Sequence, residues 1–205
     1  MTKFKNFLIL LITFIIGYIA TTMALAISNG YQLVQPVGLS MFPYLGPKTT
    51  DVIKPVNINY VKNHIGRAYA IKIDMISNNQ IDTIEPDNYV IKFVIAIGPA
   101  FVSDVNNKII VKTPNNKCLS YFYNGMYFKG VYLNPNELFL LGGNYNYSVD
   151  SRSYGTIIPN KIYKIVNVIN GISLLSKLKA ICNMANDIIS NDKNPIRLNY
   201  KKITC

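Results

Sequence analysis

Nucleophilic chemistry is suggested first by the segment PVGLSMFPYL, Pro36 to Leu45, in which Ser40 stands among mostly apolar residues. A serine hydroxyl attacks a peptide bond only when a neighbouring base takes its proton. The single histidine, His64, lies in YVKNHIGRAY, which has the composition of a loop, so we expect it to play no part in catalysis. A lysine can serve as the base when burial disfavours its charged form. Ser40 therefore requires a buried lysine.

Lys92 is the candidate for that base. It lies in YVIKFVIAI, Tyr89 to Ile97, with β-branched and aromatic residues on both sides. A lysine on the solvated face of an edge strand would show the same local pattern. We expect Lys92 to be the general base for Ser40. The three cysteines and the histidine do not have the spacing of metal ligands: Cys118, Cys182, Cys205 and His64. No metal and no cofactor is therefore expected.

The elements that must position these two residues are mostly strands. Seven apolar runs, rich in β-branched and aromatic residues and bounded by turn formers, predict strands at residues 68–74, 89–97, 108–111, 119–123, 126–133, 137–141 and 162–169. They indicate a mainly β domain of hairpins with a partly closed barrel. Apolar residues at helical spacing predict one amphipathic helix near the end: Leu174, Leu175, Leu178, Ile181, Cys182, Ala185, Ile188 and Ile189.

The N-terminal segment Phe7 to Ile27 is apolar and uncharged and follows Lys3 and Lys5. At about 1.5 Å per residue it matches a hydrocarbon core of roughly 30 Å. The preceding lysines predict a cytoplasmic N-terminus and an exported remainder. A cleaved signal peptide is the alternative, because Ala24 to Ala26 has the small residues that cleavage requires. We expect a retained anchor over residues 1–28 and one extracytoplasmic domain over residues 29–205.

The net charge of +11, from 21 basic and 10 acidic residues, raises the question of nucleic-acid binding. The lysines are scattered among Asn, Ile and Tyr, and the sequence has no nucleic-acid-binding motif. Anionic lipid head groups explain a basic surface as simply. The expected partner is therefore the lipid bilayer, and no nucleic acid.

Three segments, in order along the chain, resemble the signal peptidase I superfamily. GLSMFPYL, residues 38–45, resembles the Gly-Ser-Met-x-Pro box around the nucleophile of that family. YVIKFVIAIG, residues 89–98, resembles the box that carries its lysine base. LGGNYNYSVDSRSYGTI, residues 141–157, is similar to the third box, Gly-Asp-Asn-x-x-x-Ser-x-Asp-Ser-Arg. The single anchor and the short length are most like the TraF-type peptidases of conjugative transfer.

The resemblance implies a signal-peptidase-like fold and a role for each matching residue. Ser40 would be the nucleophile, with its backbone N–H as an oxyanion donor, and Lys92 would be the base. Ser148 would hold the lysine amine, and Asp150 and Arg152 would form an ion pair that supports the site. Five further residues match the boxes: Gly38, Met41, Pro43, Asn144 and Ser151. Met41 and Phe42 are expected on a surface that dips into the membrane.

The implied activity is hydrolysis of signal peptides or pro-peptides of exported proteins after small residues, at the bacterial cytoplasmic membrane. The substrates would be exported preproteins or a conjugative pilin precursor. A catalytically degenerate relative, acting as a subunit of a secretion or conjugation complex, is the alternative. It is suggested by Ala100 and Gly143, which stand where the family boxes carry aspartate.

Three cysteines in an exported domain allow one disulfide. We expect Cys182 and Cys205 to form it and Cys118 to stay free.

Overall fold

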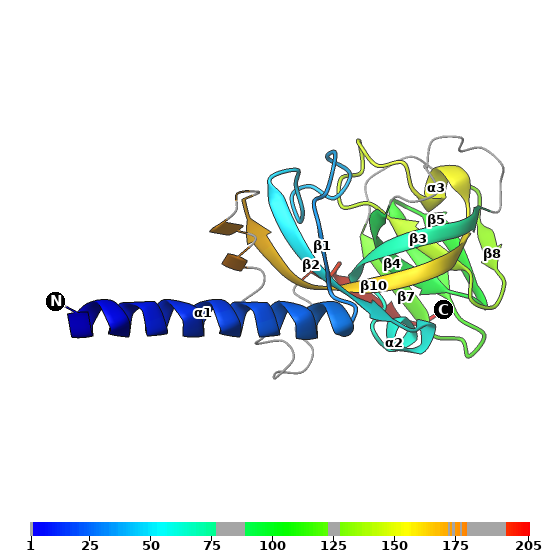
Figure 1. Cartoon of the computed structure of the whole chain (residues 1–205). Helices are drawn as coiled ribbons and strands as arrows, with labels where there is room; N and C mark the ends of the chain where they lie inside the picture. The colour runs from blue at the N-terminus through cyan, green and yellow to red at the C-terminus, as the bar shows by residue number, and fades with distance from the viewer. Residues whose placement is uncertain are drawn as a thin grey trace.

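A computed structural model of the chain describes residues 2–76, 89–122, 128–171, 173, 175, 176, 178, 179 and 196–205. A long helix, α1 (Thr2–Ser28), leads into a mainly β domain and extends away from it as a rod (Figure 1). The predicted C-terminal helix at residues 174–189 lies largely outside the described residues.

The helix α1 contains one stretch, Lys3–Ser28, that is long and apolar enough to cross a membrane. Most of its side chains are exposed, as expected for a helix that lipid could surround. Its last turns differ, because Ala26 is buried in a small apolar cluster with residues of the domain: Tyr31, Val52, Val166 and Ile169. The end of α1 is therefore packed against the β domain, and Ala24 to Ala26 lies within the continuous helix.

Two antiparallel sheets make up the domain. The first has six strands in the order β1 (Gln32–Val34), β2 (Thr49–Val56), β10 (Ile157–Asn170), β3 (Ala68–Ile76), β4 (Val90–Ile97) and β9 (Leu138–Leu141). The second has five strands in the order β11 (Tyr200–Ile203), β7 (Cys118–Phe122), β6 (Lys108–Lys112), β5 (Ala100–Val105) and β8 (Val131–Leu133). One residue pair, Ile157 with Leu138, also joins β10 to β9, but the sheets do not form a closed barrel.

The main apolar core joins the two sheets. Phe93 and Ile95 of β4 pack in one cluster with Val102 of β5 and Tyr121 of β7. Alternate residues of the strands, such as Val94, turn to a second cluster with the short helices α2 (Ile58–Asn63) and α3 (Ser151–Tyr154). Strand β4, which lies between β3 and β9, is thus covered on both faces, which explains why its sequence is a nearly continuous apolar run.

Each of the seven predicted strands overlaps an observed strand. The predicted strand at 126–133 is shorter in the structure, because only β8 (Val131–Leu133) is a strand among its described residues, whereas β10 extends well beyond the predicted 162–169. Four observed strands were not predicted: β1, β2, β5 and β11. Their segments are short or carry charged residues and proline, so their strand pattern is weak.

The disulfide prediction is wrong. Cys118 pairs with Cys205, and Cys182 lies outside the described residues. The physical reason is strand register: β11 runs antiparallel to β7 with Ile203 opposite Cys118, which brings the chain end to that cysteine. Because β11 was not predicted, the sequence offered no sign of this neighbourhood.

Candidate functional site

Ser40 lies in the loop that connects β1 to β2. Its carbonyl oxygen accepts the Asn144 N–H at 2.9 Å, and the Leu45 N–H donates to the Met41 carbonyl at 3.0 Å. The side chains of Met41 and Leu45 are buried in the main core. The loop is therefore fixed at the serine and in the residues that follow it. Asn144 contributes through its backbone, which any residue type except proline could provide.

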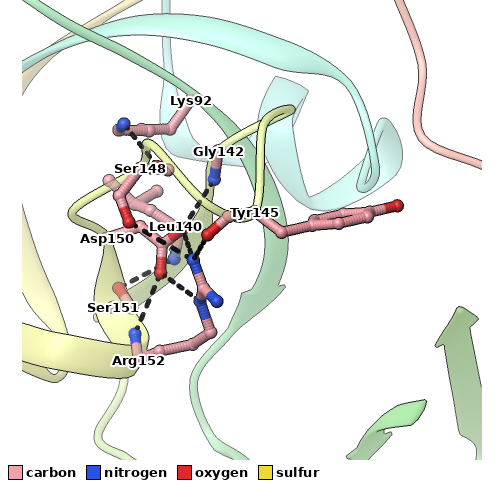
Figure 2. A network of polar contacts seen from close by, with 8 residues as sticks. All are labelled: Lys92, Leu140, Gly142, Tyr145, Ser148, Asp150, Ser151 and Arg152. Atoms are coloured by element: carbon pink, nitrogen blue, oxygen red, sulfur yellow. Dashed lines mark hydrogen bonds and ion pairs between the residues drawn. The ribbon is translucent and has the colours of Figure 1, made fainter. Parts of the chain in front are cut away.

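Lys92 lies on β4, opposite Tyr69 of β3, and only 4% of it is exposed. Its Nζ donates to the Ser148 Oγ at 2.8 Å (Figure 2). Burial lowers the pKa of Lys92 to about 8; the charge of Asp150 opposes this shift and the charge of Arg152 adds to it. A substantial fraction of this amine is therefore neutral near physiological pH.

Asp150 is fully buried, and its carboxylate accepts hydrogen bonds from several directions. Gly142 donates its N–H at 2.9 Å, and the Arg152 Nε and Nη2 donate at 2.8 and 3.0 Å (Figure 2). Asp150 also caps α3 by accepting the Arg152 N–H at 3.2 Å. The Arg152 Nη2 reaches the carbonyls of Tyr145 and Ser148 as well. One ion pair thus holds the whole loop that carries Ser148.

Two glycines allow this loop to approach the serine loop closely. A Cβ on Gly142 would overlap the Ser148 hydroxyl and lie 2.7 Å from the Ser40 carbonyl oxygen. A Cβ on Gly143 would lie 2.7 Å from the Tyr44 ring and 3.0 Å from the Met41 carbonyl oxygen. Glycine is therefore required by packing at both positions.

One cavity of about 520 Å³ contains both Ser40 and Lys92. Its walls come from two segments, one before β2 and one at the start of β4: Val34, Gln35, Pro36, Val37, Gly38, Ser40 and Met41, facing Tyr89, Val90, Ile91 and Lys92. Most of these residues are apolar. The cavity therefore combines mostly apolar walls with a serine and a buried lysine.

The other residues of the serine box have varied positions. Gly38 has a φ of +86°, in the left-handed region that favours glycine, although no atom would crowd a Cβ there. Pro43 is exposed, and so is Phe42. Met41 was expected on a membrane-facing surface, and this is wrong, since it is 3% exposed and packs in the core.

His64 lies at the end of α2 and is engaged locally. Its Nδ1 is 2.8 Å from the Tyr60 carbonyl oxygen, and its ring stacks on Tyr60 with centroids 4.2 Å apart. These contacts are those of a structural residue.

Sequence reasoning did not predict several contacts that build the site, although Ser151 itself matches the third family box. Gly142 donates to Asp150, the Tyr145 carbonyl accepts from Arg152, and the Ser151 hydroxyl accepts the Leu140 N–H at 2.9 Å. An available signal was the run Asp-Ser-Arg-Ser-Tyr-Gly, in which an aspartate before a short helix that ends at glycine is typical of a cap.

The arrangement places a hydroxyl and a low-pKa amine in one cavity, with the amine oriented by a second hydroxyl. Such a set can perform acyl transfer without a metal ligand set or a histidine. Neither a protein-family model nor a curated protein matches the sequence.

Proposed function

We propose that the protein is a membrane-anchored serine endopeptidase in which Ser40 and Lys92 act as a catalytic pair. The observation that carries this proposal is the buried Lys92 amine, held by Ser148 at 2.8 Å, in the cavity that also contains Ser40. Lysine side chains are seldom fully buried in proteins, and buried lysines with a shifted pKa are concentrated at functional sites. Here burial gives it the pKa of a base that is effective near neutral pH.

The proposed reaction is a two-step acyl transfer. Neutral Lys92 Nζ takes the Ser40 hydroxyl proton while Oγ forms a bond to the scissile carbonyl carbon. The Ser40 N–H donates to the developing oxyanion. The ammonium then returns the proton to the leaving amine as the C–N bond breaks, which leaves an ester on Ser40. Lys92 then takes a proton from water as the water oxygen attacks the ester carbon, and it returns that proton to the Ser40 Oγ as the ester C–O bond breaks, which releases the product carboxyl group.

The loop around Ser148 has a supporting role in this proposal. Ser148 orients the amine, and the pair Asp150 and Arg152 fixes the backbone on either side of Ser148. Neither charged side chain needs to touch the substrate, so both are positioning residues.

The substrates follow from the helix and from the resemblance of the three boxes to signal peptidase I. If α1 spans the membrane with its N-terminus in the cytoplasm, the β domain and its cavity lie on the extracytoplasmic side of the membrane. The packing of Ala26 on the domain favours a retained helix over a cleaved one. We propose exported preproteins or a conjugative pilin precursor as substrates, and a signal-peptidase-like fold for the domain.

Two residues favour the degenerate alternative, Ala100 and Gly143, which stand in place of aspartates of the family boxes. The close contacts of Gly143 with Tyr44 and the Met41 carbonyl give that glycine a packing reason. The missing carboxylate is therefore compatible with an intact site.

The test is cleavage of a preprotein by the full chain purified in detergent. Wild type should cleave, and Ser40→Ala should not, whereas Ser153→Ala, an exposed serine on α3, should match wild type. Lys92→Arg should abolish turnover because arginine stays protonated. Lys54→Arg, on the half-buried Lys54 of β2, is the matched control.

Two outcomes would exclude the mechanism. One is a Lys92→Arg variant that cleaves near the wild-type rate, and the other is a folded His64→Ala variant without activity. The pH profile adds a further check, since the base must be neutral: the rate should rise with pH along a limb centred near the Lys92 pKa of about 8. A folded wild type that never cleaves, and that performs no better than Ser40→Ala, would favour the degenerate alternative.

A further inference from the structure

A hydrogen bond joins the two segments that form the walls of the cavity. The Tyr89 Oη donates to the Gln32 Oε1 at 2.6 Å. Tyr89 lines the cavity and directly precedes β4, while Gln32 is the first residue of β1, two residues before the lining residue Val34. The bond therefore connects the two segments from which the walls are made.

The wall that begins at β1 has little regular structure of its own. β1 is a three-residue strand at the edge of its sheet, where it pairs with β2, and residues 35–39 belong to no strand. At its far end this wall is tied by the Ser40 carbonyl to the Asn144 N–H. Its other end, at Gln32, is held by the hydrogen bond from Tyr89. The stretch between the two ties is the part of the wall that a substrate would touch.

Tyr89 is itself held firmly. Its ring stands edge-on to Tyr163 of β10, with centroids 5.2 Å apart at 88°, and the Lys72 Nζ lies 5.4 Å from its ring centre. Burial, reinforced by Tyr163, raises the pKa of Tyr89 to about 12. The phenol therefore remains a hydrogen-bond donor over the whole working pH range. Gln32 is exposed, and its only side-chain hydrogen bond to the residues that the structure describes is the one with Tyr89, so its side chain is the one that is positioned by the contact.

We propose that Tyr89, through Gln32, sets the separation of the two cavity walls and so determines how tightly an extended substrate segment is held. This inference rests on the proposed peptidase function. Tyr89 lies three residues before Lys92, a distance of about 10 Å in an extended strand. The two walls can thus enclose roughly three substrate residues between the tie and the base. Tyr89 is a positioning residue, because it acts on the wall and not on the reacting atoms.

The kinetic test uses variants that remove the hydrogen bond between Tyr89 and Gln32. Tyr89→Phe also removes the interaction of the Tyr89 hydroxyl with Tyr163, which Gln32→Met leaves in place. Tyr89→Phe keeps the ring, and Gln32→Met keeps the side-chain length. Each should raise KM for the preprotein by roughly three- to tenfold, the equivalent of one hydrogen bond, with kcat changed by less than about twofold. The double variant should match either single variant, because both break the same bond. Gln32→Glu, which keeps an acceptor, should restore KM to near the wild-type value.

Tyr132→Phe is the matched control, since Tyr132 is 79% exposed on β8 of the other sheet. It should leave both constants unchanged. A Tyr89→Phe variant with the wild-type KM, or single-variant effects that add in the double variant, would overturn the inference.

A second measurement does not depend on activity. Amide hydrogen exchange of residues 33–39 should be faster in Tyr89→Phe than in wild type, at an unchanged melting temperature, and should not change in Tyr132→Phe. Unaltered exchange would overturn the inference even in an active enzyme. Faster exchange in a protein that cleaves nothing would support the wall contact and contradict only the peptidase function.

Discussion

Asp150 and Asp51 are both completely buried, yet their surroundings are opposite. Asp150, beside Lys92, accepts hydrogen bonds from Gly142 and from an arginine that is nearly as well buried. Asp51, on β2, is flanked by Val34 of β1 and Val168 of β10, and neither of its carboxyl oxygens has a hydrogen-bond partner among the described residues. The Asp150 carboxylate is surrounded by donors, whereas the residues opposite Asp51 on both neighbouring strands are valines.

The contrast shows two ways in which a protein can bury an acid. Donors and an opposite charge keep a carboxylate ionised, whereas apolar surroundings favour the neutral acid. Burial raises the pKa of Asp51 to about 7, and the nearby Thr49 hydroxyl offsets this only in part. Asp150 is thus held in an ion pair with Arg152 beside the proposed base, whereas Asp51 readily takes up a proton near neutral pH.

The largest effect is expected from Asp150→Leu. The substitution leaves the Arg152 guanidinium, whose side chain is 6% exposed, without its anionic partner in the interior. The free energy of unfolding should fall by about 3 to 5 kcal/mol, and cleavage should be lost. Thermal unfolding followed by circular dichroism would measure it.

Asp104→Leu serves as the control, because Asp104 on β5 is only partly buried. It should change stability by less than about 1 kcal/mol. An Asp150→Leu variant as stable as this control would mean that the ion pair does not hold the loop.

The role of Asp150 could be predicted from the sequence, whereas the burial of Asp51 could not. The segment around Asp150 matches a family box and has a helix cap, and the apolar run around Lys92 predicts burial of the lysine. In contrast, Asp51 stands in TTDVIKPV, where its charge and the proline argue against a strand. Its burial depends on β2 lying between β1 and β10, a long-range pairing that local patterns do not encode.

Other long-range contacts in the domain could not be predicted from local sequence patterns either. Strands with continuous β-branched runs, such as β4, were predicted well, because their composition alone favours a buried strand. The contact of the Ser40 carbonyl with Asn144 and the disulfide from Cys118 to Cys205 were not, because each depends on which backbone segments meet in space.

The second prediction concerns Asp51→Asn, which removes the titration while keeping the shape. With a folded pKa near 7 and an ordinary value of 3.8, the folded state holds the proton more tightly than the unfolded state. The stability that Asp51 contributes is therefore complete below about pH 4 and is lost as the pH rises to about 7. Between pH 5 and pH 8 wild type should lose about 3 kcal/mol from this group, and Asp51→Asn should not.

Melting curves of both proteins at the two pH values would measure this difference. Asp150→Asn provides the comparison, since replacing a paired carboxylate should lower stability at both pH values. If wild type and Asp51→Asn changed in parallel between pH 5 and pH 8, Asp51 would be ionised in the folded protein, and the contrast between the two acids would be lost.

The smallest expected effect comes from giving Asp51 a donor of its own. Val168 lies directly opposite Asp51 in the antiparallel pair of β10 and β2, so their side chains share a face with Cβ atoms about 5 Å apart. The hydroxyl of Val168→Thr can donate to the carboxylate, which favours the charged form and lowers the Asp51 pKa. The loss of stability between pH 5 and pH 8 should then shrink by about 1 kcal/mol. Val56→Thr, a similar change near the end of β2 where Val56 pairs with Ile162, should leave the wild-type pH dependence unchanged. Equal pH dependence in the two threonine variants would show that a hydroxyl at 168 does not reach Asp51, whereas a smaller loss in Val168→Thr alone would make the core acid behave more like Asp150.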